Sequence, residues 1–203
     1  MISRRPRQQS QPVPMRLGFV FANGSPRQVS CDRAEEIALE MSVPVPIVGV
    51  FRDNPRDQVL EVCQTVGLTM VQLHGREDPA YVAEIALDVP VIRALPTDPE
   101  QVACWSSNPD VEYLLLDGPN PGSGEPCDWP GLATILGDVK PTKPIILAGG
   151  LTPDTVGTAI KTVQPFAVDV SSGVESSRGK KEAGLIGAFC RAVAQADLSQ
   201  HDH

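Results

Sequence analysis

Seven short apolar runs recur along the chain and determine its predicted architecture. Each run is rich in Val, Ile and Leu and almost continuously apolar, which is typical of strands buried on both faces of a parallel sheet. Between them lie segments with a helical spacing of apolar residues, as at Val59, Val62 and Val66. The predicted strands are Leu17–Phe21, Ile47–Phe51, Met70–Leu73, Val91–Ala94, Tyr113–Asp117, Ile145–Ala148 and Ala167–Val170.

Four of the predicted helices begin with the same signal. A residue that caps helices stands directly before a proline, and proline suits the first helical turn because its missing N–H is not needed there. Strands alternating with such helices indicate a parallel sheet covered by helices. The four pairs are Asn54-Pro55, Asp78-Pro79, Asp98-Pro99 and Thr152-Pro153.

Small residues follow the last two predicted strands and favour one of two architectures. Both an open doubly wound sheet and a (β/α)8 barrel have this alternation, but no glycine-rich dinucleotide loop follows the first strand. In barrels, the loops after the last two strands commonly hold a phosphate. Backbone N–H groups at Gly149 and Gly150, and at Ser172 and Gly173, would approach phosphate oxygens closely. Ordinary turns are the alternative interpretation.

Composition excludes several classes of protein. The chain has 203 residues, 41% of them hydrophobic, and carries a net charge of -8 at pH 7. This acidity disfavours nucleic acid and anionic membranes as partners, and no apolar run approaches the ~18 residues of a spanning helix. Five cysteines without a C-x-x-C pair and only three histidines predict reduced thiols, a cytoplasmic location, and neither metal nor cofactor.

The two ends of the chain differ from the rest. Residues 1–16 hold four arginines, three prolines and no acidic residue. Such a segment buries too little apolar surface to offset its ordering entropy, so we expect an irregular basic tail. An organelle transit peptide and an incorrectly assigned start are the alternatives. We expect one domain over residues 17–194 and a polar tail over residues 195–203.

Several segments together resemble the phosphoribosylanthranilate isomerase family, in that family's order and spacing. The run from Asp169 to Glu175, D-V-S-S-G-V-E, is the most specific of them. The resemblance implies a TIM (β/α)8 barrel and an Amadori rearrangement of N-(5-phosphoribosyl)anthranilate in tryptophan biosynthesis. Because seven of eight strands are predicted, we expect an incomplete barrel. The other segments are Gly18–Phe21 with Ser25-Pro26-Arg27, Val71–Gly75, Leu114–Asp117 and Ile146–Leu151.

The resemblance also implies roles for single residues. Asp117 ends a strand at the catalytic face of a barrel and becomes the general acid, with a turn-capping carboxylate as the alternative. Arg27 is expected to bind the substrate's carboxylate through its planar guanidinium, unless it is only a solvated loop residue. His74 would line the pocket or serve a structural role. The phosphate of the small-molecule substrate is assigned to Gly149, Gly150, Ser172 and Gly173.

The sequence departs from the family pattern in one loop. Glu125 and Pro126 stand where the family usually has Lys-Thr. The residues around them, Gly122–Gly124 and Asp128-Trp129, still match. Loss of a cation near an anionic substrate predicts weaker binding, unless the side chain at this position points away from the substrate.

The family's catalytic base is the second departure. It is a cysteine in a Lys-x-Cys-Gly motif on the first strand, and residues 1–16 contain no cysteine. We therefore expect an isomerase by descent whose sequence lacks its true beginning and which is inactive or feeble. The alternative is a non-catalytic barrel that binds a phosphorylated ligand or a partner chain. A third alternative, which fits the sequence less well, is another barrel enzyme with a phosphorylated substrate. Either a monomer or a homodimer is expected. The available cysteines are Cys31, Cys63, Cys104 and Cys190 in predicted helices and Cys127 in a loop.

Overall fold

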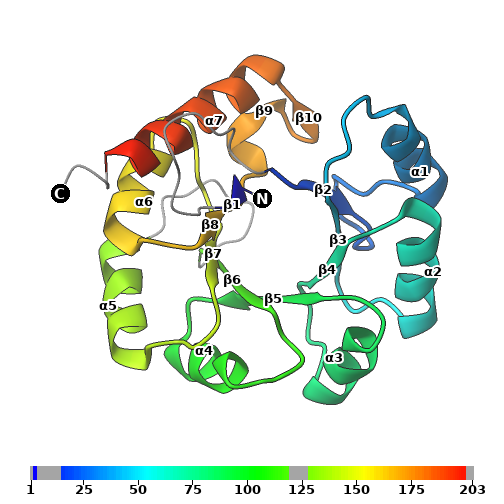
Figure 1. The fold of residues 1–203 in the computed structure, drawn as a ribbon, viewed down its shortest axis with the longest axis horizontal. Helices are drawn as coiled ribbons and strands as arrows, with labels where there is room; N and C mark the ends of the chain where they lie inside the picture. The colour runs from blue at the N-terminus through cyan, green and yellow to red at the C-terminus, as the bar shows by residue number, and fades with distance from the viewer. Residues whose placement is uncertain (1, 4–14, 119–127, 200–203) are drawn as a thin grey trace.

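Parallel strands curl around a common centre in the computed structural model, which describes residues 2–3, 15–118 and 128–199. Helices form an outer ring around them (Figure 1). The strands of the main sheet are β1 (Ile2–Ser3), β2 (Leu17–Val20), β3 (Ile47–Phe51), β4 (Met70–Leu73), β5 (Val91–Pro96), β6 (Tyr113–Asp117), β7 (Ile145–Leu147) and β8 (Ala167–Val168).

The helices follow the strands in alternation, as the sequence predicts. They are α1 (Cys31–Glu40), α2 (Arg56–Val66), α3 (Pro79–Ala86), α4 (Pro99–Ser106), α5 (Trp129–Val139), α6 (Val156–Val163) and α7 (Ala183–Leu198). After β8 come the short 3-10 helix η1 (Ser172–Val174) and a hairpin of β9 (Glu175–Ser177) and β10 (Lys180–Lys181). No helix within the described ranges is both long and apolar enough to cross a membrane.

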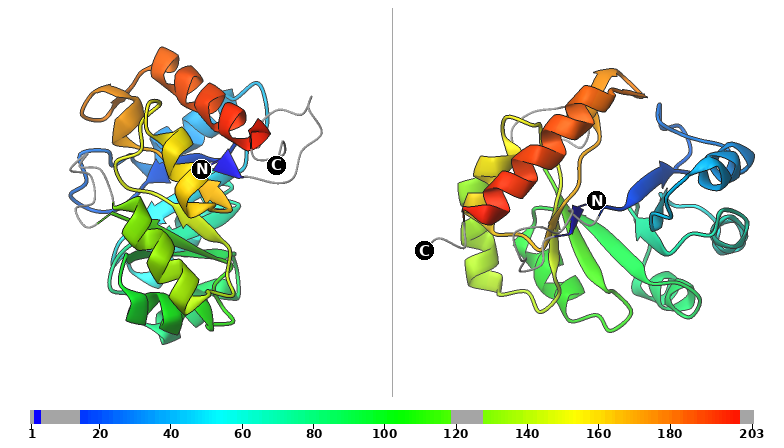
Figure 2. Two further views of the ribbon diagram at one scale, coloured as in Figure 1. Left: turned by 90° about the vertical axis from the view of Figure 1, so that its left-hand side faces the viewer. Right: turned by 45° about the horizontal axis from the view of Figure 1, so that its top comes forward.

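Hydrogen bonding joins the parallel strands in the order in which they occur along the chain, from β2 to β8. The seven parallel strands confirm the prediction of an α/β barrel that is incomplete in the described residues. The ring of helices is correspondingly interrupted between α7 and α1, which is visible from two directions (Figures 1 and 2).

The structure adds detail at both chain ends. Within the segment 1–16, which is predicted to be largely irregular, Ile2 and Ser3 pair antiparallel with Val168 and Ala167 on the edge of β8. An unpaired strand edge exposes free N–H and C=O groups, and β1 satisfies part of that edge. At the other end, α7 continues to Leu198 and buries Ala196, so the predicted polar tail over residues 195–203 starts within this helix.

The core has two layers, one on each face of the sheet. Leu114 and Leu116 on β6 face outward and pack with apolar residues of the helices. Leu115 between them belongs to the inner layer at the centre of the barrel, with Ile92 and Ile146 from neighbouring strands. Burial on both faces is the reason that the strands appear in the sequence as continuous apolar runs.

Two of the four predicted helix caps are confirmed. Asp78 and Asp98 accept hydrogen bonds from backbone N–H groups three residues on, at 2.8 Å and 3.0 Å. The other two predictions are wrong. The Asn54 side chain instead accepts from the N–H of Arg52, and α6 begins only at Val156, after a turn in which the Thr152 carbonyl accepts two N–H groups.

Candidate active site

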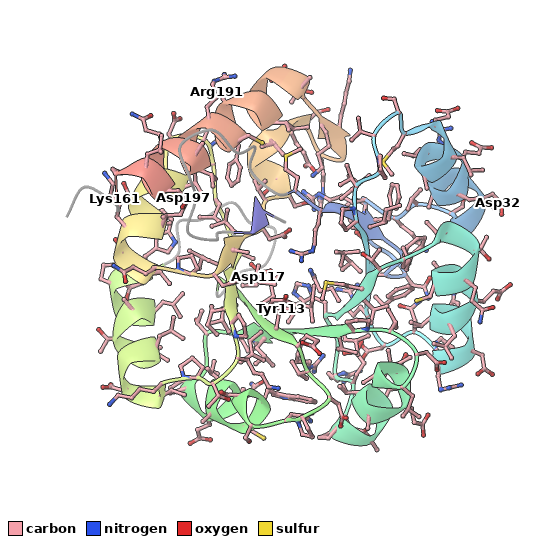
Figure 3. The ribbon with its side chains drawn as sticks, in the orientation of Figure 1. Asp32, Tyr113, Asp117, Lys161, Arg191 and Asp197 are labelled. Carbon is pink, nitrogen blue, oxygen red and sulfur yellow. The ribbon has the colours of Figure 1, made fainter. Side chains whose placement is uncertain are left out.

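Asp117 is the central acidic group of the site. It ends β6, its side chain is 12% exposed, and it lies near the middle of the ring, whereas Asp32, Lys161 and Arg191 lie on the outer rim (Figure 3). Burial raises its pKa, the neighbouring His74 lowers it, and the charge of Asp169 raises it; the net shift is upward. A carboxyl group with a raised pKa retains its proton closer to neutral pH, as a general acid requires.

His74 is placed directly beside this carboxyl group. Its backbone N–H donates to the carbonyl of Phe51 at 2.9 Å, which holds the residue against the end of β3. Its Nε2 lies 3.5 Å from Asp117 Oδ2, and its Nδ1 lies 3.1 Å from the Oε1 of Gln72. With the amide oxygen as acceptor, Nδ1 carries a hydrogen and Nε2 faces the carboxyl group. The structure therefore brings together two residues that the sequence placed on separate strands.

A buried arginine holds the backbone on both sides of His74. The Nη1 of Arg93 donates to the carbonyl of Leu73 at 3.0 Å and to Glu77 Oε2 at 2.6 Å. Its Nη2 donates to the carbonyl of Gly75 at 2.9 Å. These bonds position the segment that carries His74 at the ends of β4 and β5.

Glu77 extends this clamp to a third strand. One of its oxygens accepts from the backbone N–H of Asp53, which follows β3, and the other accepts from that of Gly75, both at 2.9 Å. Trp105 covers the guanidinium of Arg93, with 4.9 Å from its central carbon to the ring centroid. Sequence reasoning missed this pair, although an arginine inside the apolar run Val91–Ala94 was a usable signal.

The loops proposed for phosphate are packed closely against their neighbours. Gly149 and Gly150 have φ angles of +84° and +63°, which favour glycine. A Cβ at Gly149 would lie 2.8 Å from Asp117 Oδ1, and a Cβ at Gly173 would overlap the carbonyl oxygen of Leu151. Side chains are thus excluded where the loops after β6, β7 and β8 meet.

Arg27 and Glu175 form an ion pair across the open side of the sheet. Nε and Nη2 of Arg27 contact the two oxygens of Glu175 at 2.7 Å and 2.9 Å. The hydrogen bond from Arg27 lowers the pKa of Glu175 to about 2, against the opposing effect of burial. The sequence analysis assigned Arg27 to a substrate carboxylate, whereas here one edge of its guanidinium already binds a carboxylate of the chain. Glu175 ends the D-V-S-S-G-V-E motif, but the motif by itself does not indicate a pairing with Arg27.

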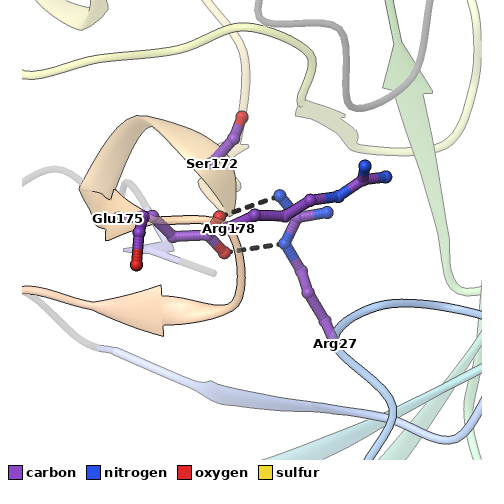
Figure 4. A pocket seen from close by; sticks show the side chains of 5 residues that line it. Arg27, Ser172, Glu175 and Arg178 are labelled. Carbon is purple, nitrogen blue, oxygen red and sulfur yellow. Dashed lines mark hydrogen bonds and ion pairs between the residues drawn. The ribbon is translucent and has the colours of Figure 1, made fainter.

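Lys181 completes this outer cluster. Its Nζ donates to Glu175 Oε1 at 2.9 Å and to the carbonyl of Ser171 at 2.8 Å, which ties β10 to the start of η1. A pocket of about 340 Å³ opens beside it (Figure 4). The residues that line the pocket are Arg27, Ser172, Glu175, Ser177 and Arg178.

Comparison with known proteins agrees with this geometry. Residues 6–192 match the family described as N-(5'phosphoribosyl)anthranilate (PRA) isomerase. This chain belongs to that family. A relative from Dechloromonas aromatica, named N-(5'-phosphoribosyl)anthranilate isomerase, is 39% identical over 188 residues, which are 90% of this chain and 87% of the relative.

Solved structures of phosphoribosylanthranilate isomerases share the fold. One, described as a complex with reduced 1-(o-carboxyphenylamino)-1-deoxyribulose 5-phosphate, superposes with a TM-score of 0.77 at 34% identity, covering 89% of this chain and 87% of that one. Another, described as monomers generated from the dimeric enzyme of Thermotoga maritima, has a TM-score of 0.76 at 34% identity, with coverages of 89% and 87%. The family resemblance and barrel fold are thereby confirmed.

The resemblance assigns the catalytic base to a cysteine on the first strand, so the positions of the cysteines in this phosphoribosylanthranilate isomerase bear on its catalysis. The four cysteines in the described ranges all lie on helices rather than at strand ends, namely Cys31, Cys63, Cys104 and Cys190. Burial raises the pKa of Cys63 to about 11 and also raises those of Cys31 and Cys190. A raised pKa disfavours the thiolate that acts as a base. Cys127, Gly122–Gly124, Glu125 and Pro126 lie outside the described residues.

Proposed function

We propose that this chain catalyses the Amadori rearrangement of N-(5-phosphoribosyl)anthranilate to the carboxyphenylamino-deoxyribulose phosphate in tryptophan biosynthesis. The observation that carries the proposal is the buried Asp117 at the carboxyl end of β6, beside His74. Family membership over residues 6–192 supports the choice of reaction. In barrel enzymes, residues at these strand ends form the active site.

The first step opens the furanose ring. The leaving ring oxygen needs a proton, and Asp117 is proposed to supply it as general acid. Burial favours its protonated form, while His74, when both ring nitrogens carry a proton, favours the carboxylate left after transfer. Thus His74 is assigned to the pocket wall and not to acid or base chemistry.

The second step moves a proton from C2 of the sugar and needs a base. None of the cysteines in the described part of the chain is placed for it, since all are on helices. We therefore propose that turnover by this polypeptide alone is low. Acid–base catalysis contributes about 10²–10⁴-fold in rate, so the lack of a suitably placed base among the described residues would account for a loss of that order.

Two further groups of the substrate require recognition. We assign the phosphate to the backbone at Gly149, Gly150, Ser172 and Gly173, because small residues follow the last two parallel strands there and leave backbone N–H groups accessible to phosphate oxygens. The carboxylate of the anthranilate moiety is assigned to the pocket that contains Arg27. We further propose a cytoplasmic enzyme without nucleic-acid or membrane partners, either monomeric or homodimeric; light scattering during gel filtration decides the assembly.

The test is a fluorescence assay that follows consumption of phosphoribosylanthranilate. Three proteins are compared: the chain as given, the chain with a family-type first strand and helix carrying Lys-x-Cys-Gly ahead of Leu17, and that restored protein with Asp117→Asn. We expect little activity from the first, recovery in the second, and a loss of about 10²–10⁴-fold in the third. Circular dichroism checks that the Asn variant is folded.

Each arm has an outcome that contradicts its assignment. Full activity from the chain as given would show that its base is elsewhere. Retained activity in the Asp117→Asn variant would remove this carboxyl group from the mechanism. An inactive but folded restored protein would refute the proposed reaction.

A further inference from the structure

The pocket beside the β9–β10 hairpin contains a second arginine, Arg178, which stands between the two strands of the hairpin. Arg178 lines the same pocket as Arg27, and its side chain extends past the Arg27–Glu175 pair in the close-up view (Figure 4). The residue is exposed, and its guanidinium forms no hydrogen bond or ion pair with any residue that the structure describes. It is therefore available to a ligand.

The charge balance of this pocket favours an anion. The carboxylate of Glu175 already accepts from Arg27, from Lys181 and from the N–H of Gly179. Its single negative charge is thus outnumbered by the two cations bound to it, and Arg178 adds another positive charge. Three cations, Arg27, Arg178 and Lys181, thus stand against the one carboxylate of Glu175 in this part of the structure.

Arg27 alone is a poor receptor for a second carboxylate. Its Nε–Nη2 edge is engaged by Glu175 at 2.7 Å and 2.9 Å, so only the outer edge of the guanidinium faces the pocket. A carboxylate bound there would share the guanidinium with Glu175, so a further donor would strengthen its binding. Arg178 is the residue that offers one from the same pocket.

We propose that Arg178 is a specificity-determining residue that binds the aromatic carboxylate of the substrate together with the outer edge of Arg27. This inference rests on the proposed function, because it assigns one group of that substrate. The phosphate is assigned to the loops after β7 and β8, which adjoin this pocket at Ser172. The two anions of one ligand are thereby recognised in different ways: an arginine pair for the planar carboxylate and backbone groups for the phosphate.

The experiment measures binding to the chain as it exists, by calorimetry. The probes are reduced 1-(o-carboxyphenylamino)-1-deoxyribulose 5-phosphate, its counterpart made from aniline, which lacks the carboxylate, and its dephosphorylated form. The proteins are the wild type, Arg178→Gln, and the matched control Lys180→Gln, which removes the same charge from the same hairpin. Melting temperatures check that the variants are folded.

We expect Arg178→Gln to weaken binding of the carboxylated probe about five- to twentyfold, as for the loss of an exposed charge-assisted hydrogen bond. The aniline-derived probe should lose less than about twofold, and the dephosphorylated probe should lose as much as the full one. Lys180→Gln should change each Kd by less than about twofold.

The outcomes separate this inference from the proposed function. If the wild type binds the full probe but Arg178→Gln binds it equally well, the assignment of Arg178 is wrong and the function stands. If the variant weakens all three probes equally, or Lys180→Gln matches it, Arg178 contributes only general charge and the assignment is again wrong. Failure of the folded wild type to bind the full probe would overturn both.

Discussion

Two arginine–glutamate pairs lie at the carboxyl ends of the strands, and they differ in almost every other respect. Arg93 within β5 and Glu77 in the loop after β4 are separated by 16 residues and have side chains only 6% and 2% exposed. Arg27 and Glu175 are separated by 148 residues, join the loops that follow the first and last parallel strands, and are 18% and 4% exposed.

The surroundings of each pair decide what it does. The inner pair, Arg93–Glu77, is balanced in charge. Its remaining hydrogen bonds go to backbone carbonyl and N–H groups on either side of His74. The pair therefore positions the backbone on both sides of His74. The outer pair, Arg27–Glu175, has two further cations near it, Lys181 and Arg178, and a pocket beside it. The same two residue types thus act as a structural clamp where they are enclosed and as part of a receptor where positive charge is in excess.

The largest effect is expected from breaking the inner pair. Arg93→Met leaves the buried charge of Glu77 without its partner and frees two carbonyl groups, so the free energy of unfolding should fall by about 3–5 kcal/mol. Urea unfolding followed by circular dichroism measures this loss. Arg76→Met, on the exposed side of the same loop, is the control and should change stability by less than about 0.5 kcal/mol. A loss below about 1 kcal/mol in Arg93→Met would mean that the clamp is not a principal support of this region.

The Arg27–Glu175 pair should make the free energy of unfolding depend on pH in the acidic range. The pKa of Glu175 is lowered from 4.5 to about 2, so its contribution is present above pH 4.5 and disappears as the pH falls toward 2. After allowance for solvent screening, the contribution is about 1–3 kcal/mol. The difference in unfolding free energy between the wild type and Glu175→Gln should therefore be constant from pH 7 to 5 and shrink between pH 4.5 and 2. A difference that does not change over that range would argue that the pair contributes nothing through ionisation.

A helix cap next to the inner pair should have a smaller effect than the pair itself. Asp78 follows Glu77 directly and caps α3 through the N–H of Tyr81 at 2.8 Å. Asp78→Ala should cost about 1 kcal/mol of stability, since one N–H loses its partner at an exposed helix end. Asp78→Asn, which keeps an acceptor, should cost only a few tenths. Equal losses in both variants would point to the charge rather than the cap.

Salt should affect the stability contributions of the two pairs differently, and this is the smallest of the expected effects. Raising sodium chloride from 0.1 to 1 M shortens the Debye length from about 10 to 3 Å and screens the outer pair more than the enclosed one. The cost of Glu175→Gln should fall by roughly 0.5 kcal/mol, whereas the cost of Arg93→Met should stay within error. Urea titrations at both salt concentrations provide the comparison. Equal salt dependence would mean that the exposure of the two pairs does not differ in solution.

Local patterns were sufficient for much of the fold because they depend on neighbours in the chain. A run such as Tyr113–Asp117 predicted β6 with its observed bounds, since burial on both faces requires a continuous apolar segment. Asp78 and Asp98 predicted helix starts because a cap bonds within one turn. The predicted cap at Asn54 is wrong because its side chain accepts a hydrogen bond from another local backbone group, the N–H of Arg52.

The amino-acid sequence by itself determined the alternation of strands and helices, the family, and the position of Asp117 at a strand end. Only the tertiary structure decided which residues meet: the side chains of His74 and Asp117 at 3.5 Å, the side chains of Arg27 and Glu175, and the backbones of Ile2 and Val168. Apolar periodicity specifies that a segment is buried, but it carries no information about its distant neighbours. Those contacts arise when the strands curl into one sheet and bring the ends of separate segments to a common face, where geometry and charge select the partners.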